Sequence, residues 1–104
     1  MRLEEMPTVR FLGEECTIDI ARYGGGMPSI SLTCSDGEPM AKATVNIPDA
    51  WTREEPPIVF IKNYSENDGI MEVLQHAGII GPSLWKVPIG FVAADACKLL
   101  VEVD

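Results

Sequence analysis

Apolar and polar residues alternate with a period of two along much of the first half of the chain. A short, mainly apolar run at Val9–Leu12 comes first. The alternating runs that follow it are Cys16–Ala21, Ser29–Cys34 and Lys42–Ile47. Because successive side chains of a strand point to opposite faces, each run predicts a strand with one apolar and one polar face. The pairs Gly13-Glu14 and Asp36-Gly37 predict tight hairpin turns between them. The first half therefore predicts a four-stranded antiparallel meander that is covered on one side.

The second half of the chain predicts further strands around one helix. The polar stretch 48–57 is rich in proline and predicts a loop, because proline cannot donate a hydrogen bond to a strand ladder. Ile58–Ile61 is apolar at every position and too short for a helix, which predicts a buried strand. The segment 84–94 contains a proline and a glycine and predicts only short or edge strands, and alternation returns over residues 96–103.

Residues 65–77 carry a helical pattern. The apolar positions recur at helical spacing and are Ile70, Val73, Leu74 and Ala77. Ser65 and Asp68 have the spacing of a capping box, which predicts that the helix begins at Ser65. Gly78 predicts a left-handed residue that ends the helix.

These elements predict a single α+β domain over residues 1–104. Its architecture is an antiparallel β-sheet meander with one α-helix packed on its apolar face. A chain of 104 residues buries roughly 65% of its surface on folding, which supports one core without metal or disulfide staples. Hydrophobic residues make up 46% and charged residues 23% of the chain, the balance of a globular domain.

The charge of the chain is strongly negative. Eight Lys and Arg residues stand against sixteen Asp and Glu residues, a formal net charge of −8 at pH 7. Binding to phosphates requires clustered basic residues, so we expect no direct nucleic-acid binding. No apolar run is long enough to cross a membrane and the first five residues do not resemble a signal peptide, so we expect no membrane association. The three cysteines are an odd number without a close pair, which fits a reducing compartment, so we expect a cytoplasmic location.

The chain offers few groups for metal binding or catalysis. Cys16, Cys34 and Cys97 form no closely spaced pair and predict three buried, reduced thiols. His76 is the only histidine and falls in the last turn of the predicted helix, where a cation is favoured by the helix dipole. We therefore expect no metal, no cofactor and no catalytic residue, and we do not expect an enzyme.

Two kinds of residue are candidates for binding a protein. Trp51 and Trp85 lie outside the clean alternations, and each fits an interface anchor as well as it fits a core residue. The carboxylates that would form an acidic contact surface are Glu54, Glu55, Glu66, Asp68 and Glu72. The segment 65–72 contains no basic residue, so it predicts either a solvated helix start or a contact for a basic partner.

Several segments resemble a family of uncharacterised small domains from bacterial mobile elements and phages. They are Ile61–Gly69, with its Tyr-Ser-Glu-Asn core, Leu74–Ile80, Val87–Val92 and Ala43–Pro48. The resemblance covers most of residues 30–100, and the chain departs from it at Asp68 and at 83–85. It implies no activity, but its neighbourhood of small acidic proteins includes inhibitors of host defence such as anti-CRISPR proteins.

Two functions follow as hypotheses. The first is a non-enzymatic, acidic protein-binding module that inhibits a host defence nuclease of the CRISPR type by occluding its basic nucleic-acid-binding surface. The second is a structural or regulatory accessory protein that acts on other proteins of a mobile element. If the five carboxylates lie on one surface, that arrangement favours the inhibitor.

Overall fold

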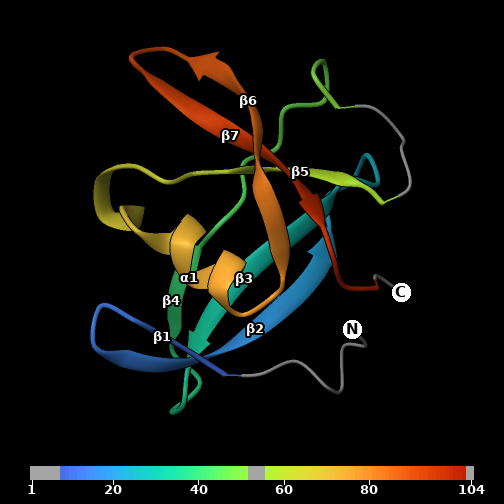
Figure 1. Ribbon diagram of the computed structural model, residues 1–104. Coiled ribbons are helices and arrows are strands. Elements are labelled where there is room, and N and C mark those ends of the chain that lie inside the picture. The colour runs from blue at the N-terminus through green and yellow to red at the C-terminus, as the bar shows by residue number, and fades with distance from the viewer. Residues whose placement is uncertain (1–7, 52–55, 103–104) are drawn as a thin grey trace.

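The computed structural model describes residues 8–51 and 56–102 of the chain (Figure 1). In chain order the elements are β1 (Val9–Phe11), β2 (Glu14–Arg22), β3 (Pro28–Cys34), β4 (Pro39–Lys42), β5 (Ile58–Ile61), a 3-10 turn η2 (Ser65–Asn67), α1 (Ile70–His76), β6 (Ile80–Ile89) and β7 (Val92–Leu99). The helices of the described part of the chain are all too short or too polar to cross a membrane.

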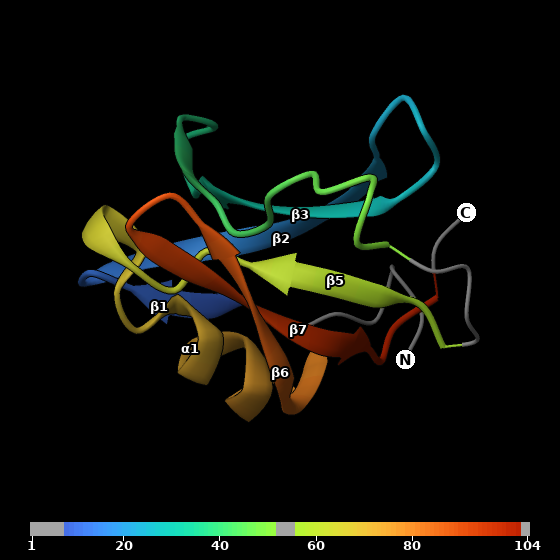
Figure 2. The same ribbon diagram turned by 90° about the horizontal axis from the view of Figure 1, so that it is seen from above.

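The strands form two antiparallel sheets. The first sheet has the order β1-β2-β3-β4 and the second has the order β5-β7-β6. Figure 2 shows β2 and β3 in one layer and β5 and β7 in the next, with α1 beside β6. The α+β class, with a meander and one helix, is therefore confirmed. The second sheet, which has three strands, adjoins the helix.

One hydrophobic cluster fills the space between these layers. The first sheet contributes Ile18, Ile30 and Leu32, and α1 contributes Ile70 and Leu74. The second sheet adds its own buried side chains from β5 and β7. The alternation of the first half thus places one apolar face against α1 and the second sheet, and this burial is the main stabilising contribution expected for such a core.

The fourth strand of the meander differs from its prediction. Residues 39–42 form β4, whereas Ala43–Val45 cross from the first sheet to the second. The Ala43 amide donates to the Ile30 carbonyl of β3, and the Ala43 carbonyl accepts from the amide of Lys62, just after β5. The prediction of a strand over 42–47 was wrong because its alternation reflects contacts with two different sheets.

In the second sheet, β5 is buried on both of its faces. Each of the four β5 residues is buried, which confirms the predicted strand. Val59 and Ile61 face the first cluster, whereas Ile58 and Phe60 belong to a second cluster on the opposite face. The segment 45–51 covers that second cluster with partly buried side chains.

The helix is shorter than predicted and begins differently. The Asp68 amide donates to the Ser65 carbonyl in the 3-10 turn, and neither residue forms the predicted side-chain capping box. Gly69 then has a φ of 93°, a left-handed conformation that separates the turn from α1. Asn63 Oδ1 takes the capping role, since it accepts from the amides of Gly69 (3.1 Å) and Met71 (2.9 Å).

The end of the helix agrees with its prediction. Gly78 has a φ of 78°, its amide donates to the Gln75 carbonyl, and the Ile79 amide donates to the Leu74 carbonyl. These two bonds form a Schellman motif. The chain then enters β6 directly.

The prediction of only short or edge strands over 84–94 is confirmed in part. β6 lies at the edge of its sheet, where proline is tolerated, but it is ten residues long and begins at Ile80. Its partner β7 ends at Leu99, earlier than the alternation to 103 predicted, and Val103 lies outside the described residues.

Candidate protein-binding surface

The β6–β7 hairpin has one apolar face. Three cross-strand pairs lie on it, and they are Trp85↔Ala96, Val87↔Ala94 and Ile89↔Val92. Side chains on directly opposed residues share a face of the sheet, so these pairs continue the second hydrophobic cluster outwards along the hairpin. Phe91 follows in the turn between the strands.

Exposure along this apolar face is uneven. Val87 and Ile89 are partly buried against the second cluster, whereas Trp85 is 45% exposed, Val92 is 37% exposed and Phe91, in the adjoining turn, is fully exposed. We call these five residues the hairpin strip. A single exposed apolar residue is ordinary, but several on one hairpin are typical of an interaction surface.

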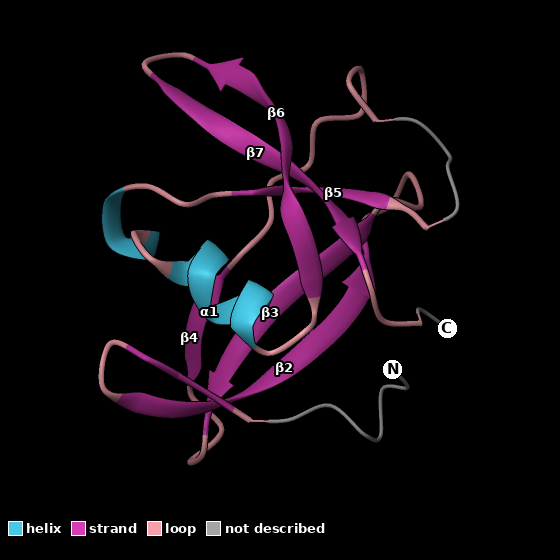
Figure 3. Ribbon diagram, in the orientation of Figure 1, coloured by secondary structure: helices cyan, strands magenta, loops and turns pink. Residues whose placement is uncertain are grey.

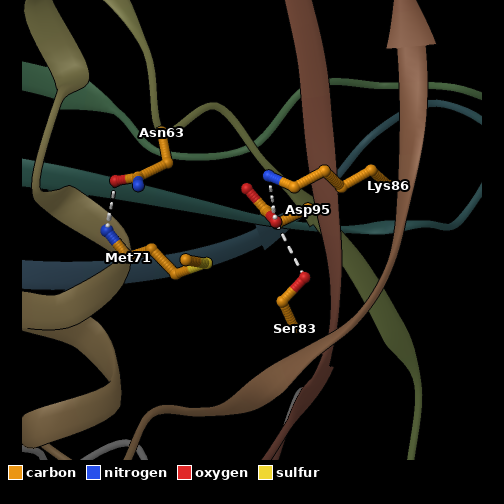
Figure 4. Close-up of polar contacts among 5 residues, drawn as sticks. All are labelled: Asn63, Met71, Ser83, Lys86 and Asp95. Carbon is orange, nitrogen blue, oxygen red and sulfur yellow. Dashed lines mark hydrogen bonds and ion pairs between the residues drawn. The ribbon is translucent and has the colours of Figure 1, made fainter.

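The opposite face of the same hairpin holds a buried carboxylate (Figure 4). Asp95 of β7 is only 3% exposed. Its Oδ1 accepts a hydrogen bond of 2.7 Å from Ser83 Oγ and forms an ion pair of 3.1 Å with Lys86 Nζ. These contacts offset the cost of burying the carboxylate.

These polar contacts also fix the position of Trp85. The β6–β7 register shifts between Ser83 and Trp85, so regular pairing is interrupted at Leu84. Ser83 and Lys86 lie on either side of that irregularity and both bind one oxygen of Asp95. The polar face therefore holds β6 on β7 where the ladder is weakest, and Trp85 is directed to the apolar face.

Cys97 lies next to this polar group but is not suited to act as a nucleophile. It is fully buried. Burial, with a smaller contribution from the Asp95 carboxylate, raises the pKa of the Cys97 thiol to about 11. Since the thiolate is the reactive form, Cys97 stays protonated and unreactive at neutral pH. Within residues 8–51 and 56–102 no group of three or more His, Cys, Asp or Glu side chains could hold a metal ion.

The structure brings together only part of the predicted acidic surface. Glu66, Asp68 and Glu72 are all exposed on η2, the following turn and α1. Glu54 and Glu55 lie outside the described residues. Figures 1 and 2 both place η2 on the same side of the molecule as the end of the β6–β7 hairpin.

Glu72 has a different environment from the other two carboxylates. It lines a groove of about 590 Å³ between β1 and α1, whose lining residues are Thr8, Val9, Arg10, Glu72, Val73, His76 and Ala77. Arg10, far from Glu72 in the sequence, and His76, one helical turn after it, share this groove with Glu72. The segment 65–72 is therefore acidic at Glu66 and Asp68 and mixed in charge at Glu72.

A second acidic region, which was not predicted, lies at one end of the first sheet. The start of β2 and the turn after β3 lie at the same end, because Cys16 pairs with Cys34 in the β2–β3 ladder. The exposed carboxylates there are Glu14, Glu15, Asp36 and Glu38. Antiparallel pairing is the signal that could have predicted this region, since it brings these two segments together.

The two tryptophans have different surroundings. Trp51 is half-buried and packs against the second cluster, which fits the core alternative. Trp85 is largely exposed in the hairpin strip, which fits the interface alternative. Phe91 and Val92 were not predicted as binding residues, and their signal was an apolar pair directly after Gly90, where a hairpin turn is usually polar.

Comparisons of the chain with known protein families, curated proteins and solved structures found no match.

Proposed function

We propose that this protein is a protein-binding module that docks through the hairpin strip. The observation that carries the proposal is the exposure of Trp85 and Phe91 on a hairpin whose other face is held by Asp95. Aromatic side chains are enriched among the residues that contribute most to binding, because they bury a large area with little loss of conformational freedom. We expect these two residues to enter an apolar depression of the partner.

The charge of the molecule supports a partner with a basic surface. Of the eleven acidic residues that the structure describes, ten are exposed, and the net charge of the chain is −8. The segment of η2 and its C-cap, which carries Glu66 and Asp68, lies on the same side as the end of the hairpin, so these carboxylates would meet the rim of a bound partner. Charges at a rim act mainly on the rate of association and on specificity, whereas buried anchors act on the rate of dissociation.

The proposal is a binding protein rather than an enzyme. Buried polar side chains are engaged with the fold: Thr44 Oγ1 accepts from the Ile30 amide at 3.1 Å, and Asn67 Nδ2 donates to the Lys42 carbonyl at 2.7 Å. Asp95 is engaged with Ser83 and Lys86. These contacts stabilise the fold, and this supports a function that depends on the surface.

For the partner we propose a nucleic-acid-binding protein of the bacterial host, such as a defence nuclease. The resemblance of 61–69 to small domains from mobile elements supports this choice, as does the excess of exposed carboxylates. The protein would occlude a basic surface of that nuclease without binding nucleic acid itself.

The experiment is a quantitative capture from a bacterial host lysate with the wild-type protein and three variants. Trp85→Ala and Phe91→Ser alter the hairpin strip, and Leu12→Ser removes another exposed apolar side chain, whose exposed fraction lies between theirs, from the β1–β2 turn. We expect a protein that the wild type and Leu12→Ser capture and that both strip variants lose. Equal capture by all four proteins would refute docking through the strip.

The nature of the captured protein tests the second part of the proposal. We expect its nucleic-acid binding to fall when wild-type protein is added and to be unaffected by Phe91→Ser. A captured protein that binds no nucleic acid would contradict the nuclease proposal and favour the accessory role on a mobile element.

A further inference from the structure

Cys16 and Cys34 are directly opposite each other on neighbouring antiparallel strands. They are partners in the β2–β3 register, although eighteen positions separate them in the sequence. Cys16 is buried in the first hydrophobic cluster, whereas Cys34 is partly exposed near the end of β3. The prediction of three buried thiols is therefore wrong for Cys34, because it lies beside the β3–β4 turn, where the cover of the cluster ends.

The hydrogen bonds of Cys34 define the geometry of this pair. Its amide donates to the Glu38 carbonyl at 2.8 Å, and its carbonyl accepts from the Gly37 amide at 2.9 Å. The amide and carbonyl of a strand residue point to the same side, so both of these groups point away from β2. Cys16 and Cys34 therefore form a non-hydrogen-bonded pair, in which opposed Cα atoms are about 4.5 Å apart and side chains are close.

That separation lies at the short end of the range that a disulfide spans, which is about 4.4–6.8 Å between Cα atoms. The Cys16 thiol donates to the Glu14 carbonyl at 3.5 Å, beside the Cys34 position across the ladder. The Cys34 sulfur lies 3.7 Å from the Met40 sulfur on β4, so it lies at the edge of the cluster. The pair thus combines a buried thiol with an adjacent thiol that a reagent can reach.

We propose that Cys16 and Cys34 form a reversible disulfide when the protein meets a low-molecular-weight disulfide. The Cys34 thiolate attacks one sulfur of the reagent, which forms a mixed disulfide and releases one thiol that takes up a proton. Cys16 then loses its proton and attacks the Cys34 sulfur, which forms the Cys16–Cys34 bond and releases the second thiol. The two protein thiols lose two electrons in total, and the reagent is reduced to two thiols.

The surroundings of the pair affect the rate and the stability of the bond. Burial, followed by the influence of Cys34 and of Glu14, raises the pKa of the Cys16 thiol, so the second step accelerates as the pH rises. A short cross-strand disulfide is strained and therefore more easily reduced than a structural disulfide. The exposed carboxylates of the nearby turns favour a cationic reagent over an anionic one.

The test incubates the folded wild-type protein with cystamine, a cationic small disulfide, at low protein concentration. Intact mass spectrometry and proteolytic mapping then identify the products. We expect a monomer that has lost two hydrogen atoms, with its disulfide between Cys16 and Cys34, and recovery of the original mass after addition of a dithiol. Cys97→Ala serves as the matched control and should give the same product.

Three results would overturn the proposal. They are a mixed disulfide at Cys34 that persists without a Cys16–Cys34 bond, a disulfide that includes Cys97, and a disulfide between two molecules. Cys34→Ser should not lose two hydrogen atoms, and their loss from this variant would also contradict the pairing. Mapping of the wild type decides the question even if this variant folds poorly, and the result is independent of the function proposed above.

Discussion

The β2–β3 hairpin and the β6–β7 hairpin each have one apolar face, but the rest of the chain covers these faces to different extents. The inner residues of the first hairpin, such as Ile30 and Leu32, are fully buried under α1 and the second sheet. The apolar face of the second hairpin is covered in part, by the segment 45–51 together with Tyr23 and Met27. Trp85, opposite Ala96, and Phe91 and Val92, at the end of the hairpin, stay exposed. The same type of pattern therefore yields a core in one region and a free surface in the other.

The difference also separates stability from binding. Burial of an apolar side chain stabilises the folded state in proportion to the area removed from water. The side chains of the hairpin strip bury only part of their apolar area on folding, so they stabilise the fold less. Substitutions in the first hairpin should therefore lower stability, whereas substitutions at the end of the second should lower binding.

The largest expected difference is between Leu32→Ala and Phe91→Ala. Leu32 is fully buried, and its truncation should lower the free energy of unfolding by about 2–5 kcal/mol through lost burial and a cavity. Phe91 is fully exposed, and its truncation should change that free energy by less than about 0.5 kcal/mol. Urea denaturation of both variants and the wild type measures the two values. A loss of more than about 1 kcal/mol in Phe91→Ala would mean that the strip belongs to the core.

The second prediction concerns pH and the thiol of Cys97. Its pKa is raised to about 11, so the folded state prefers the neutral thiol. This contribution is fully present below the pKa of the unfolded thiol, about 8.5, and is lost as the pH rises through the pKa of the folded state. Between about pH 8 and pH 10 the wild type should lose up to about 2 kcal/mol more stability than Cys97→Ala.

Urea denaturation of both proteins at the two pH values gives this difference directly. Other groups that titrate in the same range affect both proteins alike, so they cancel. An identical pH dependence in the two proteins would show that the Cys97 thiol is not held in its neutral form.

The third prediction tests the polar face of the second hairpin. Ser83→Ala removes the 2.7 Å hydrogen bond to the buried Asp95 carboxylate, and we expect a loss of about 1–2 kcal/mol in the free energy of unfolding. Ser31→Ala is the matched control, since Ser31 is a partly exposed serine on β3 of the first sheet. Amide hydrogen exchange should become faster in β6 of Ser83→Ala and stay unchanged in β3. If amide exchange became faster to the same extent in β6, β3 and the other elements, this contact would have no local role.

The two hairpins also explain which parts of the fold the sequence predicts. Alternation predicted the strands around Ile18 and Leu32 correctly because one face of each is polar, largely exposed on β2 and mostly part-buried on β3. Pairing irregularities at Ser83 and Trp85 interrupt the alternation of β6, so no strand of that length could be recognised. The crossing at Ala43 alternates for a different reason, because it pairs with both sheets in turn.

The helix start and the binding surface show the same limit. Ser65 and Asp68 have the spacing of a capping box, but Asn63 caps the helix from outside that local pattern. Trp85 could be proposed from its residue type, whereas its exposure depends on how far the segment 45–51 extends over the second sheet. Such coverage is a property of the tertiary structure and has no local sequence signal.

The smallest expected effect concerns the acidic residues beside the hairpin. As part of the proposed function, Glu66→Gln and Asp68→Asn should each lower the association rate with a basic partner by a few-fold, because exposed charges attract a partner over about one Debye length. The dissociation rate should change little, and Phe91→Ser should show the opposite behaviour. Stopped-flow or surface-based kinetics at low and physiological salt separate the two rates.

Glu72→Gln is the matched control, because Arg10 and His76 share its groove and reduce its effect on a distant cation. An association rate that is insensitive to salt and to both substitutions would leave docking through the strip possible but would refute steering by this acidic segment.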